Sequence, residues 1–551
     1  MYLEIAIALS SLIGCISCDR NSPDSSSKNV SCNYTVTIDP STKGNVIPNL
    51  VSNINVWSMD GRFVNPTVKS SYNVFDFVEY VQLMTATGGE NSRDLFKDPS
   101  DKSILDDYDY STLFANCHGI LSLGAKPHIK LGNIPAKFTK EFKTDTFGVN
   151  VYSPEDYSKY YVYIKDLMDA LVAEFGLEEV KTWHFGVFTE YENKEWFQGL
   201  DGTPESAATE FCKIYDWTVQ AVCDVLGPDA YIGAHSMTVT EGLWDEALFI
   251  QHCGEGTNWC TGEKGSHISY LATSFYDFAP GKFTTGKTLP QCIDYLRSTA
   301  GKYGLTGLKY GVDEGRILGS RSGKERTDLF SRTVGYRYMA AYDARLYGQM
   351  LDCGGSYISS WEYLSENLLE GNPSVSYHVA ENISRMAGMN RVEVLTEGVK
   401  PFDGAEIKAY AGVDPSTGKT TVMLYHFKNA LTYNATATVR LSLKTGSSND
   451  KVSCQIRKVD DECNWFDEWV ADRKELGITD DMFSWSPDDA CCINRFLTNS
   501  FAKGEYQKRM SKYRDCSALS PENCKLKVEK DGTVTLICKV QGNTVWFIDF
   551  E

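Results

Sequence analysis

The sequence between residues 46 and 385 alternates short runs rich in β-forming residues with longer runs of helical periodicity. Such alternation is typical of parallel strands joined by crossover helices. The strand-like runs lie at residues 54–57, 81–85, 126–131, 180–188, 230–235, 268–276, 308–314 and 357–361. Eight strands are what a closed parallel barrel requires. We therefore predict an α/β chain with a (β/α)₈ TIM barrel over residues 46–385.

The segment 153–188 shows the repeating unit most clearly. Ser153 and Pro154 indicate the start of a helix, because a hydroxyl side chain can cap the first turn and proline suits the first helical position. Apolar residues then recur at helical spacing as far as Phe175, and Gly176 suits the position after a helix. The β-rich run that follows is the fourth predicted strand.

From about residue 386 the sequence pattern changes to short runs in which apolar and polar residues alternate, separated by turn residues, as is typical of antiparallel strands. These runs lie at residues 419–426, 436–442, 533–539 and 543–549. They predict a C-terminal antiparallel β-sandwich over residues 386–551. The run 32–38 also alternates, so we interpret residues 18–45 as a polar leader plus a strand that joins this sandwich.

The first residues contain an apolar run, 5–14, that is too short to span a bilayer. It suits the apolar region of a secretory signal peptide, which we place at residues 1–17, although no Lys or Arg precedes it. A bacterial lipoprotein box at 12–15 is the alternative, and it would predict a lipid-anchored protein of the cell surface. Cleavage after Ser17 leaves 16 of the 17 cysteines, an even number that favours the secreted, extracellular interpretation.

The cysteine content also bears on the compartment. Seventeen cysteines exceed what a reduced cytosolic enzyme usually carries, so several disulfide bonds are expected. Asn-x-Ser/Thr sequons at Asn29, Asn33, Asn382 and Asn434 favour a glycoprotein of a eukaryotic secretory route. No Cys-x-x-Cys pair with matching histidine spacing is present. We therefore predict neither a metal site nor a cofactor.

The charge balance restricts the partners. A formal net charge of −19 argues against nucleic acid or an anionic membrane surface, because both require a basic face. A neutral oligosaccharide makes no such demand. The aromatic content of 12% could supply flat surfaces for sugar stacking, although large cores account for most aromatic residues.

Two glutamates stand at the C-terminal ends of predicted strands, where the βα loops of a barrel form active sites. Glu190 follows the fourth strand and Glu314 ends the seventh, so the two would face each other across the barrel mouth. Retaining cleavage of a glycosidic bond needs one carboxyl group that protonates the leaving oxygen. It needs a second, about 5–5.5 Å away, that attacks the anomeric carbon. The pair therefore predicts a retaining glycosidase.

The chain resembles glycoside hydrolase family 39, the β-xylosidase and α-L-iduronidase group, over roughly residues 40–551. The segments that carry the resemblance are 110–114, 124–135, 178–190, 272–276, 360–361, 365–366, 457–461, Asn464, Trp469 and the terminal strand. The resemblance implies a barrel followed by a sandwich. It also implies an exo-acting enzyme that hydrolyses β-xylosides, or a related glycoside, by double displacement.

By this resemblance Glu190 is the acid/base and Glu314 is the nucleophile. Tyr276 would hydrogen-bond the nucleophile, and Trp361 would form the floor of the −1 subsite. The substrate-binding residues expected as a set are Lys130, Thr189, Tyr276, Arg316 and Trp361.

Several positions near the two glutamates depart from the family pattern. Gln82 and Met84 stand where the family has Arg and His, and Lys130 stands where it has an acid. Thr189 and Ser274 stand where the family has Asn and His. Asp313 and Gly315, on either side of Glu314, stand where it has Thr and Trp. Lys130 would bind the carboxylate of a uronic acid or form a structural salt bridge. The strand histidines His128, His184 and His235 are interpreted as buried core residues rather than metal ligands. Because so much of the surrounding shell differs, a catalytically inactive barrel that binds carbohydrate remains the alternative hypothesis.

Overall fold

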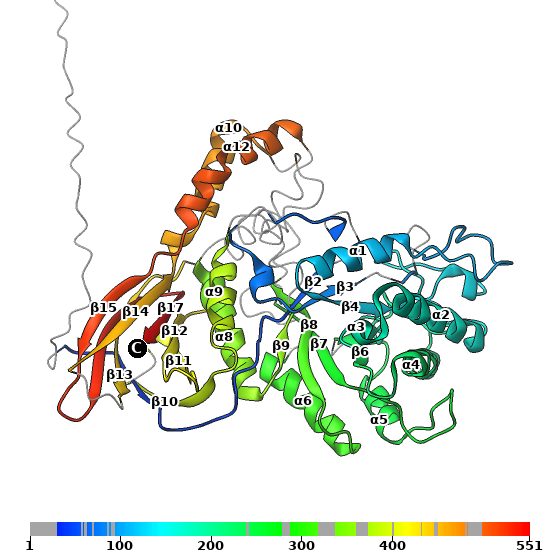
Figure 1. Ribbon diagram of the computed structural model, residues 1–551, viewed down its shortest axis with the longest axis horizontal. Helices are drawn as coiled ribbons and strands as arrows, with labels where there is room; N and C mark the ends of the chain where they lie inside the picture. The colour runs from blue at the N-terminus through cyan, green and yellow to red at the C-terminus, as the bar shows by residue number, and fades with distance from the viewer. Residues whose placement is uncertain are drawn as a thin grey trace, which may run out of the picture.

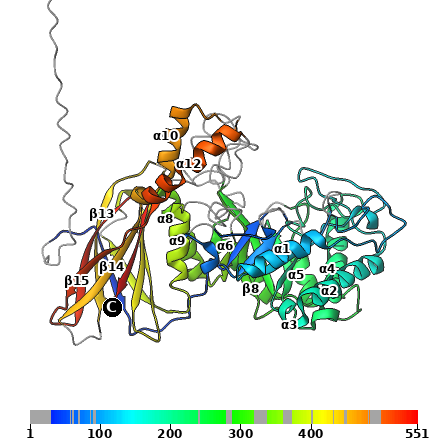
Figure 2. The same ribbon diagram turned by 45° about the horizontal axis from the view of Figure 1, so that its top comes forward.

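The structure is a computed structural model of the 551-residue chain. It describes residues 30–56, 59, 63–68, 71–84, 87–89, 94–238, 242–277, 287–317, 337–359, 373–398, 402–430, 432–445, 450–479, 482 and 499–551. Figure 1 shows a barrel and a β-sandwich side by side, and the view of Figure 2 agrees.

Eight parallel strands form the barrel in the order in which they occur along the chain. They are β2 (Asn53–Val56), β3 (Tyr80–Leu83), β4 (Lys126–Leu131), β5 (His184–Val187), β6 (Ile232–Met237), β7 (Tyr270–Asp277), β8 (Lys309–Ile317) and β9 (Tyr357–Ile358). The amide of Ile358 donates to the carbonyl of Leu50 over 2.8 Å, which ties the last strand to the segment that enters the first. The predicted (β/α)₈ fold class is therefore confirmed.

Helices cover the outside of the barrel. The described ones are α1 (Ser111–Ser122), α2 (Tyr157–Phe175), α3 (Leu177–Val180), α4 (Pro204–Leu226), α5 (Ala247–Glu255), α6 (Leu289–Lys302), α8 (Arg337–Cys353) and α9 (Val375–Ser384). Short 3₁₀ turns lie at Val74–Asp76 and Ala136–Phe138. Helix α2 is capped by the Asp156 carboxylate, which accepts from the amides of Ser158 and Lys159. The prediction that Ser153 caps this helix was wrong, because the helical turn closes only where Asp156 can satisfy those amides.

The second sheet has nine strands in the order β15-β14-β17-β12-β11-β10-β1-β13-β16. Its strands are β1 (Tyr34–Asp39), β10 (Asn390–Gly398), β11 (Glu406–Val413), β12 (Thr420–Phe427), β13 (Thr436–Lys444), β14 (Lys451–Val459), β15 (Glu522–Lys527), β16 (Thr533–Gln541) and β17 (Thr544–Phe550). All neighbours are antiparallel except β1 and β13. The two end strands touch, so the sheet folds over one apolar core as a sandwich. The exact domain boundaries stay predictions.

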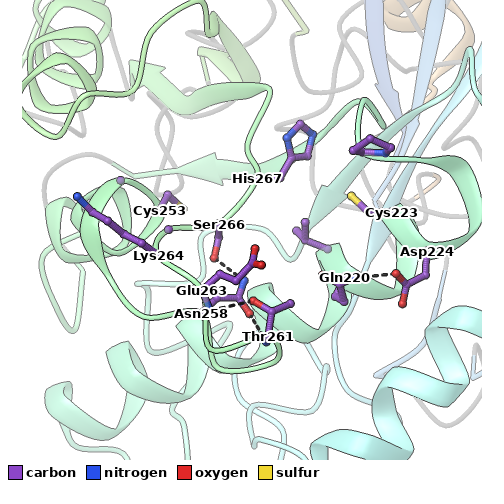
Figure 3. A pocket seen from close by; sticks show the side chains of 14 residues that line it. Gln220, Cys223, Asp224, Cys253, Asn258, Thr261, Glu263, Lys264, Ser266 and His267 are labelled. Carbon is purple, nitrogen blue, oxygen red and sulfur yellow. Dashed lines mark hydrogen bonds between the residues drawn. The ribbon is translucent and has the colours of Figure 1, made fainter.

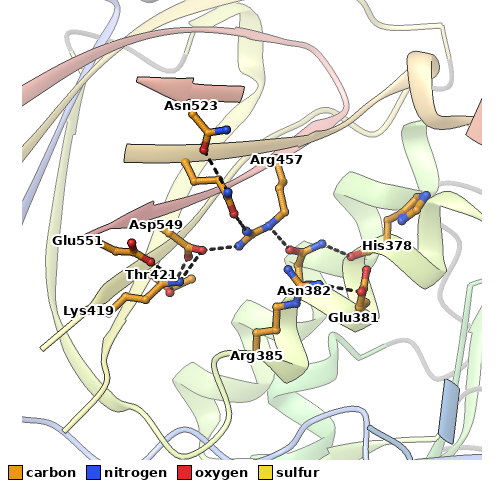
Figure 4. Close-up of polar contacts among 11 residues, drawn as sticks. His378, Glu381, Asn382, Arg385, Lys419, Thr421, Arg457, Asn523, Asp549 and Glu551 are labelled. Atoms are coloured by element: carbon orange, nitrogen blue, oxygen red, sulfur yellow. Dashed lines mark hydrogen bonds and ion pairs between the residues drawn. The ribbon is translucent and has the colours of Figure 1, made fainter. Parts of the chain in front are cut away.

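Helices α8 and α9 lie between the barrel and this sandwich (Figure 1). A buried polar network connects α9 to the sheet (Figure 4). Arg457 of β14 donates to Asn382 of α9 over 2.6 Å and to Asp549 of β17 over 2.8 Å. Asn382 is only 1% exposed and its amide also donates to the carbonyl of His378. This sequon is therefore enclosed by protein in the folded chain and cannot carry a glycan there.

Between β14 and β15 the chain forms a helical arm, which we define as α10 (Phe466–Leu476) and α12 (Ser500–Ser517). The two helices project from the sandwich in both ribbon views (Figure 2). Trp469 packs edge-on against Tyr506, with ring centroids 5.0 Å apart, and so holds them together. Within the described ranges, no helix combines the length and the apolar character that a membrane span requires.

Candidate active site

Glu190 and Glu314 both lie at the C-terminal end of the barrel. Glu190 comes three residues after β5, and its amide donates to the carbonyl of Ser236 in β6 over 2.6 Å. Its backbone has φ of +41°, in the left-handed region that a non-glycine residue adopts only where the surroundings hold it. Glu314 lies in β8. The exposed fractions of the two residues are 8% and 6%, so both carboxyl groups are buried.

Three donors surround the carboxyl group of Glu190. Asn193 donates to Oε2 over 3.2 Å and the indole of Trp196 donates to the same oxygen over 3.1 Å. The hydroxyl of Ser274 bonds the carboxyl group as well. Burial raises the pKa of Glu190, and the three hydrogen bonds oppose that effect by stabilising the charged form.

Glu314 accepts a hydrogen bond from the hydroxyl of Tyr276, 2.6 Å from Oε1. This is the contact that the family resemblance implies. Burial, followed by the negative charge of Glu190, raises the pKa of Glu314 to about 8. The Tyr276 hydrogen bond and the positive charge of Lys130 act in the opposite direction.

The two carboxyl groups converge on one place. Ser274, which bonds Glu190, stands directly opposite Glu314 in the register between β7 and β8. The charge of Glu190 also contributes to the raised pKa of Glu314. Two interacting buried carboxyl groups titrate as a unit and hold a single proton between their two titration steps. One protonated and one ionised carboxyl group is also what a double displacement needs at its start.

Lys130 belongs to the same site. It lies in β4, is 1% exposed, and its Nζ lies 4.6 Å from the ring centroid of Trp196. The indole of that Trp196 is the one that donates to Glu190. A buried ammonium group therefore stands beside the indole that bonds Glu190, and its positive charge lowers the pKa of Glu314.

Of the other predicted substrate-binding residues, only Thr189 has its side chain in the described part of the structure. Thr189 is buried and its Oγ1 lies 3.4 Å from Nδ1 of His235, inside the barrel. Arg316 lies in β8 opposite Tyr276, but its side chain is outside the described part of the structure. Trp361 lies outside the described residues altogether. The roles assigned to these residues stay predictions.

Asp313 is a site residue to which the sequence interpretation gave no role. The register passes from Thr273 opposite Val312 to Ser274 opposite Glu314, so Asp313 is the extra residue of a β-bulge. Such bulges re-aim side chains, and they are frequent beside active sites. The bulge accounts for two consecutive acidic residues of one strand that are both buried in the barrel.

A set of donors holds the Asp313 carboxylate. Gln82 donates to Oδ1 over 2.7 Å, Tyr357 donates to the same oxygen over 2.6 Å, and the Ser236 amide lies 3.3 Å from Oδ2. Nε2 of His235 is 3.7 Å from Oδ2. Burial raises the pKa of Asp313 to about 6 in spite of these bonds. Gln82 therefore binds the carboxylate next to Glu314 in this chain, at the position where the family has Arg.

Of the three strand histidines, His128 and His235 are buried inside the barrel as predicted, whereas His184, at the start of β5, is partly exposed. Burial lowers the pKa of His128 to about 3, so the ring is neutral, and it lies 3.1 Å from the hydroxyl of Tyr270. His184 stacks on Tyr80, with ring centroids 3.6 Å apart. In the part of the chain that the structure describes, no group of His, Cys, Asp and Glu side chains is arranged to hold a metal ion.

A polar pocket of about 510 Å³ lies between α4 and the segment that leads into β7 (Figure 3). Gln220 and Cys223 of α4 line one side of it, and Asn258, Lys264 and His267 come from the segment between α5 and β7. These residues precede β7, whereas Glu314 and Tyr276 lie toward the C-terminal ends of their strands. The pocket is therefore separate from the candidate active site.

Comparison with known proteins supports the resemblance. The family model for glycosyl hydrolases family 39 matches residues 95–297, a range that includes Lys130, Glu190 and Tyr276 but not Glu314. A β-xylosidase from Caldicellulosiruptor saccharolyticus is 30% identical over 158 residues, 28% of this chain and 29% of that protein. A β-xylosidase from Geobacillus stearothermophilus is 25% identical over 149 residues, 27% of this chain and 28% of that protein. The matched stretch thus spans under a third of the length of either curated relative.

The likeness in fold extends much further than the likeness in sequence. The crystal structure of a bacterial orthologue of human α-L-iduronidase superimposes with a TM-score of 0.65 at 14% identity. That alignment covers 95% of this chain and 84% of the other. The barrel and the sandwich therefore both recur in a structure of the group that this chain resembles.

Proposed function

We propose that this chain, which resembles glycoside hydrolase family 39, is a retaining glycosidase that acts on β-xylosides or a related glycoside. The observation that supports it most is the convergence of two buried carboxyl groups at the C-terminal end of the barrel. Two successive displacements at one anomeric carbon require two carboxyl groups beside each other, which is why this observation supports the proposal. The substrate would be an oligosaccharide or a simple glycoside, and no step needs a cofactor.

In the first step Glu190 donates its proton to the glycosidic oxygen while Glu314 attacks the anomeric carbon. The bond to the leaving group breaks and a covalent glycosyl–enzyme forms on Glu314. In the second step Glu190, now ionised, takes a proton from water, and the resulting hydroxide displaces Glu314 from the sugar. Burial and the charge of Glu190 raise the pKa of Glu314 to about 8, and the Tyr276 hydroxyl and the Lys130 ammonium group oppose this rise. The cycle begins from the form of the pair in which Glu190 carries the shared proton and Glu314 is ionised.

A panel of aryl glycosides tests the proposal directly. We expect hydrolysis of an aryl β-xyloside, arabinoside, galactoside, glucoside or uronide, with the anomeric configuration retained in the first-formed sugar. Complete inactivity on the whole panel at several pH values would contradict the proposal. If the uronide is preferred, Lys130→Met should raise KM for the uronide and leave KM for the neutral glycosides nearly unchanged, because only the uronide carries a carboxylate.

The pH dependence of kcat/KM should be set by the two titration steps of the Glu190–Glu314 pair, because only the form that holds one proton is active. The rate rises as the pair loses its first proton and falls as it loses the second, which gives a bell-shaped profile. Lys130→Met removes a positive charge that lowers the pKa of Glu314, so the profile should move to higher pH. Asp313→Asn removes a negative charge that raises this pKa, so the profile should move to lower pH. Shifts in the same direction for both variants would contradict this electrostatic account.

A catalytically inactive, carbohydrate-binding barrel is the second candidate function. It is favoured by Thr189, whose hydroxyl faces His235, and by Gln82, which is engaged by Asp313. Neither side chain then offers the sugar the group that the family places there. Titration calorimetry with xylo-oligosaccharides and uronides distinguishes the two functions, since binding heat without any released sugar would favour the inactive barrel.

For the location of the protein we propose the secretory route, with a lipid-anchored form as the alternative. The apolar run at residues 5–14 and the content of 17 cysteines support it. Expression with the native N-terminus followed by sequencing of the mature end tests it. Secreted protein that begins near residue 18 is expected, whereas acylated protein that begins at Cys15 would establish the lipid anchor instead.

A further inference from the structure

Three thiols lie in the apolar core of the sandwich. The structure describes 13 of the 17 cysteines, all as thiols. Cys454 of β14, Cys524 of β15 and Cys538 of β16 all belong to or pack against the core between the folded halves of the sheet. Cys454 is 3% exposed and Cys538 is 0% exposed.

Cys454 and Cys524 stand directly opposite each other in the antiparallel register of β14 and β15. The backbone hydrogen bonds between β14 and the C-terminal residues on its other side show whether Cys454 and Cys524 form a hydrogen-bonded or a non-hydrogen-bonded pair. Ser453 exchanges two backbone hydrogen bonds of 3.0 Å with Glu551, so the backbone groups of Ser453 point away from β15. Those of its neighbour Cys454 therefore point toward β15. The amide of Val528 donates to the carbonyl of Asp450 over 2.9 Å, which continues the same alternation.

Cys454 and Cys524 are thus a hydrogen-bonded cross-strand pair. Opposite residues of this type have Cα atoms about 5.5 Å apart. Disulfides span Cα separations of about 4.4–6.8 Å, most often about 5.5–6 Å, so the separation expected for this pair is one that a disulfide can bridge. The two side chains lie on the same face of the sheet, because residues directly opposite each other in an antiparallel pair share a face. The interaction between the two thiols raises the pKa of Cys454 and lowers that of Cys524.

Cys538 is close but differently placed. It pairs with Val439 in the register of β13 and β16, so no cysteine stands opposite it. Its thiol is fully buried, and burial raises its pKa. Cys524 is partly exposed and can be reached by a small disulfide or by an oxidoreductase. Access and alignment both favour Cys524 with Cys454 over any pair that includes Cys538.

We propose that Cys454 and Cys524 form a disulfide bond when the chain folds in an oxidising compartment. Each thiol loses its proton and the sulfurs join, while the two electrons reduce an external disulfide such as oxidised glutathione to two thiols. The bond closes a loop of about 70 residues that contains α10 and α12. It also fastens β15, the end strand of the sheet, to its only described ladder partner, β14.

The consequence concerns the helical arm. Both ends of the arm are tied to the helices beside the barrel, through an ion pair of 2.8 Å between Arg337 and Asp461 and a hydrogen bond of 2.7 Å between His378 and the carbonyl of Ser517. A covalent bond between β14 and β15 joins the two strands from which the arm leaves and to which it returns. It therefore limits how far the arm can separate from the sandwich. The inference is independent of the glycosidase proposal.

The test uses the full chain equilibrated with mixtures of reduced and oxidised glutathione, then quenched with acid, alkylated in denaturant so that buried free thiols also react, and digested. We expect a cross-linked peptide pair that joins Cys454 to Cys524. The thermal transition of the sandwich should be roughly 5–10 °C higher in the oxidised protein than in the reduced one. Cys524→Ser should abolish that difference, whereas the matched variant Cys538→Ser should keep it.

Two results would overturn the proposal. One is alkylation of both Cys454 and Cys524 after full oxidation of the native wild-type protein. The other is a cross-linked peptide that joins Cys538 to either of them. Because both results come from the wild-type chain, they remain informative even if a serine variant fails to fold.

Discussion

Replacing Glu314 by alanine is expected to lower kcat on aryl glycosides by roughly 10⁴-fold or more, because it removes the atom that forms the covalent intermediate. The side chain has no near substitute. Glu190 is occupied by Asn193, Trp196 and Ser274, and Asp313 is held by Gln82 and Tyr357 deeper in the barrel. KM should change much less than kcat, since the lost interaction is made with the reacting carbon. Initial-rate kinetics on the preferred aryl glycoside measures both.

Azide distinguishes loss of the nucleophile from a general loss of structure. In Glu314→Ala a bound azide ion can attack the anomeric carbon from the vacated side, so activity should partly return and the product of a β-glycoside should be the α-glycosyl azide. Glu192→Gln is the matched control. Glu192 is a buried carboxyl group two residues from Glu190, its pKa is raised to about 8 by burial, and it accepts from Thr238. The control should retain wild-type kcat. A Glu314→Ala enzyme that turns over normally would remove Glu314 from the mechanism.

The barrel could be predicted from the sequence because each of its strands and helices is indicated by a pattern within one short segment of the chain. Each strand-like run is bounded by turn residues and followed by a run of helical periodicity, as in α2 and the β5 strand after it. The strand-end positions of Glu190 and Glu314 followed from that pattern, and the parallel topology then required them to approach each other. The hydrogen bond from Tyr276 to Glu314 came from the family resemblance and is present in the structure.

The surroundings of the glutamates could not be predicted, because they depend on contacts between distant parts of the chain. Gln82 and Asp313 are 231 positions apart, and nothing in either local sequence indicates that they meet. The bulge at Asp313 changes which residues of β8 face inward, and a strictly alternating strand pattern cannot represent it. One signal was present: Asp313 directly follows the apolar run 310–312 of a barrel strand, and a carboxyl group buried there needs partners.

Replacing Glu190 by alanine should give a loss that depends on the leaving group. General acid catalysis contributes about 10²–10⁴-fold, and it matters only when the leaving oxygen needs a proton. With an unactivated alkyl β-xyloside we expect a fall of that size in kcat/KM. With a dinitrophenyl β-xyloside the first step should hardly change, because that phenolate leaves without protonation. The second step then becomes slow, because no base activates water.

The slow second step makes the intermediate observable. Intact-protein mass spectrometry of Glu190→Ala with the dinitrophenyl glycoside should show one added glycosyl residue, located on Glu314 by peptide mapping. Azide should accelerate turnover and yield the β-glycosyl azide, because it displaces the sugar from Glu314 in a second inversion. The opposite anomer from Glu190→Ala would mean that the roles of the two glutamates are exchanged. Equal losses on both substrates would mean that Glu190 supplies no proton, and the site would then have to protonate the leaving group through another residue.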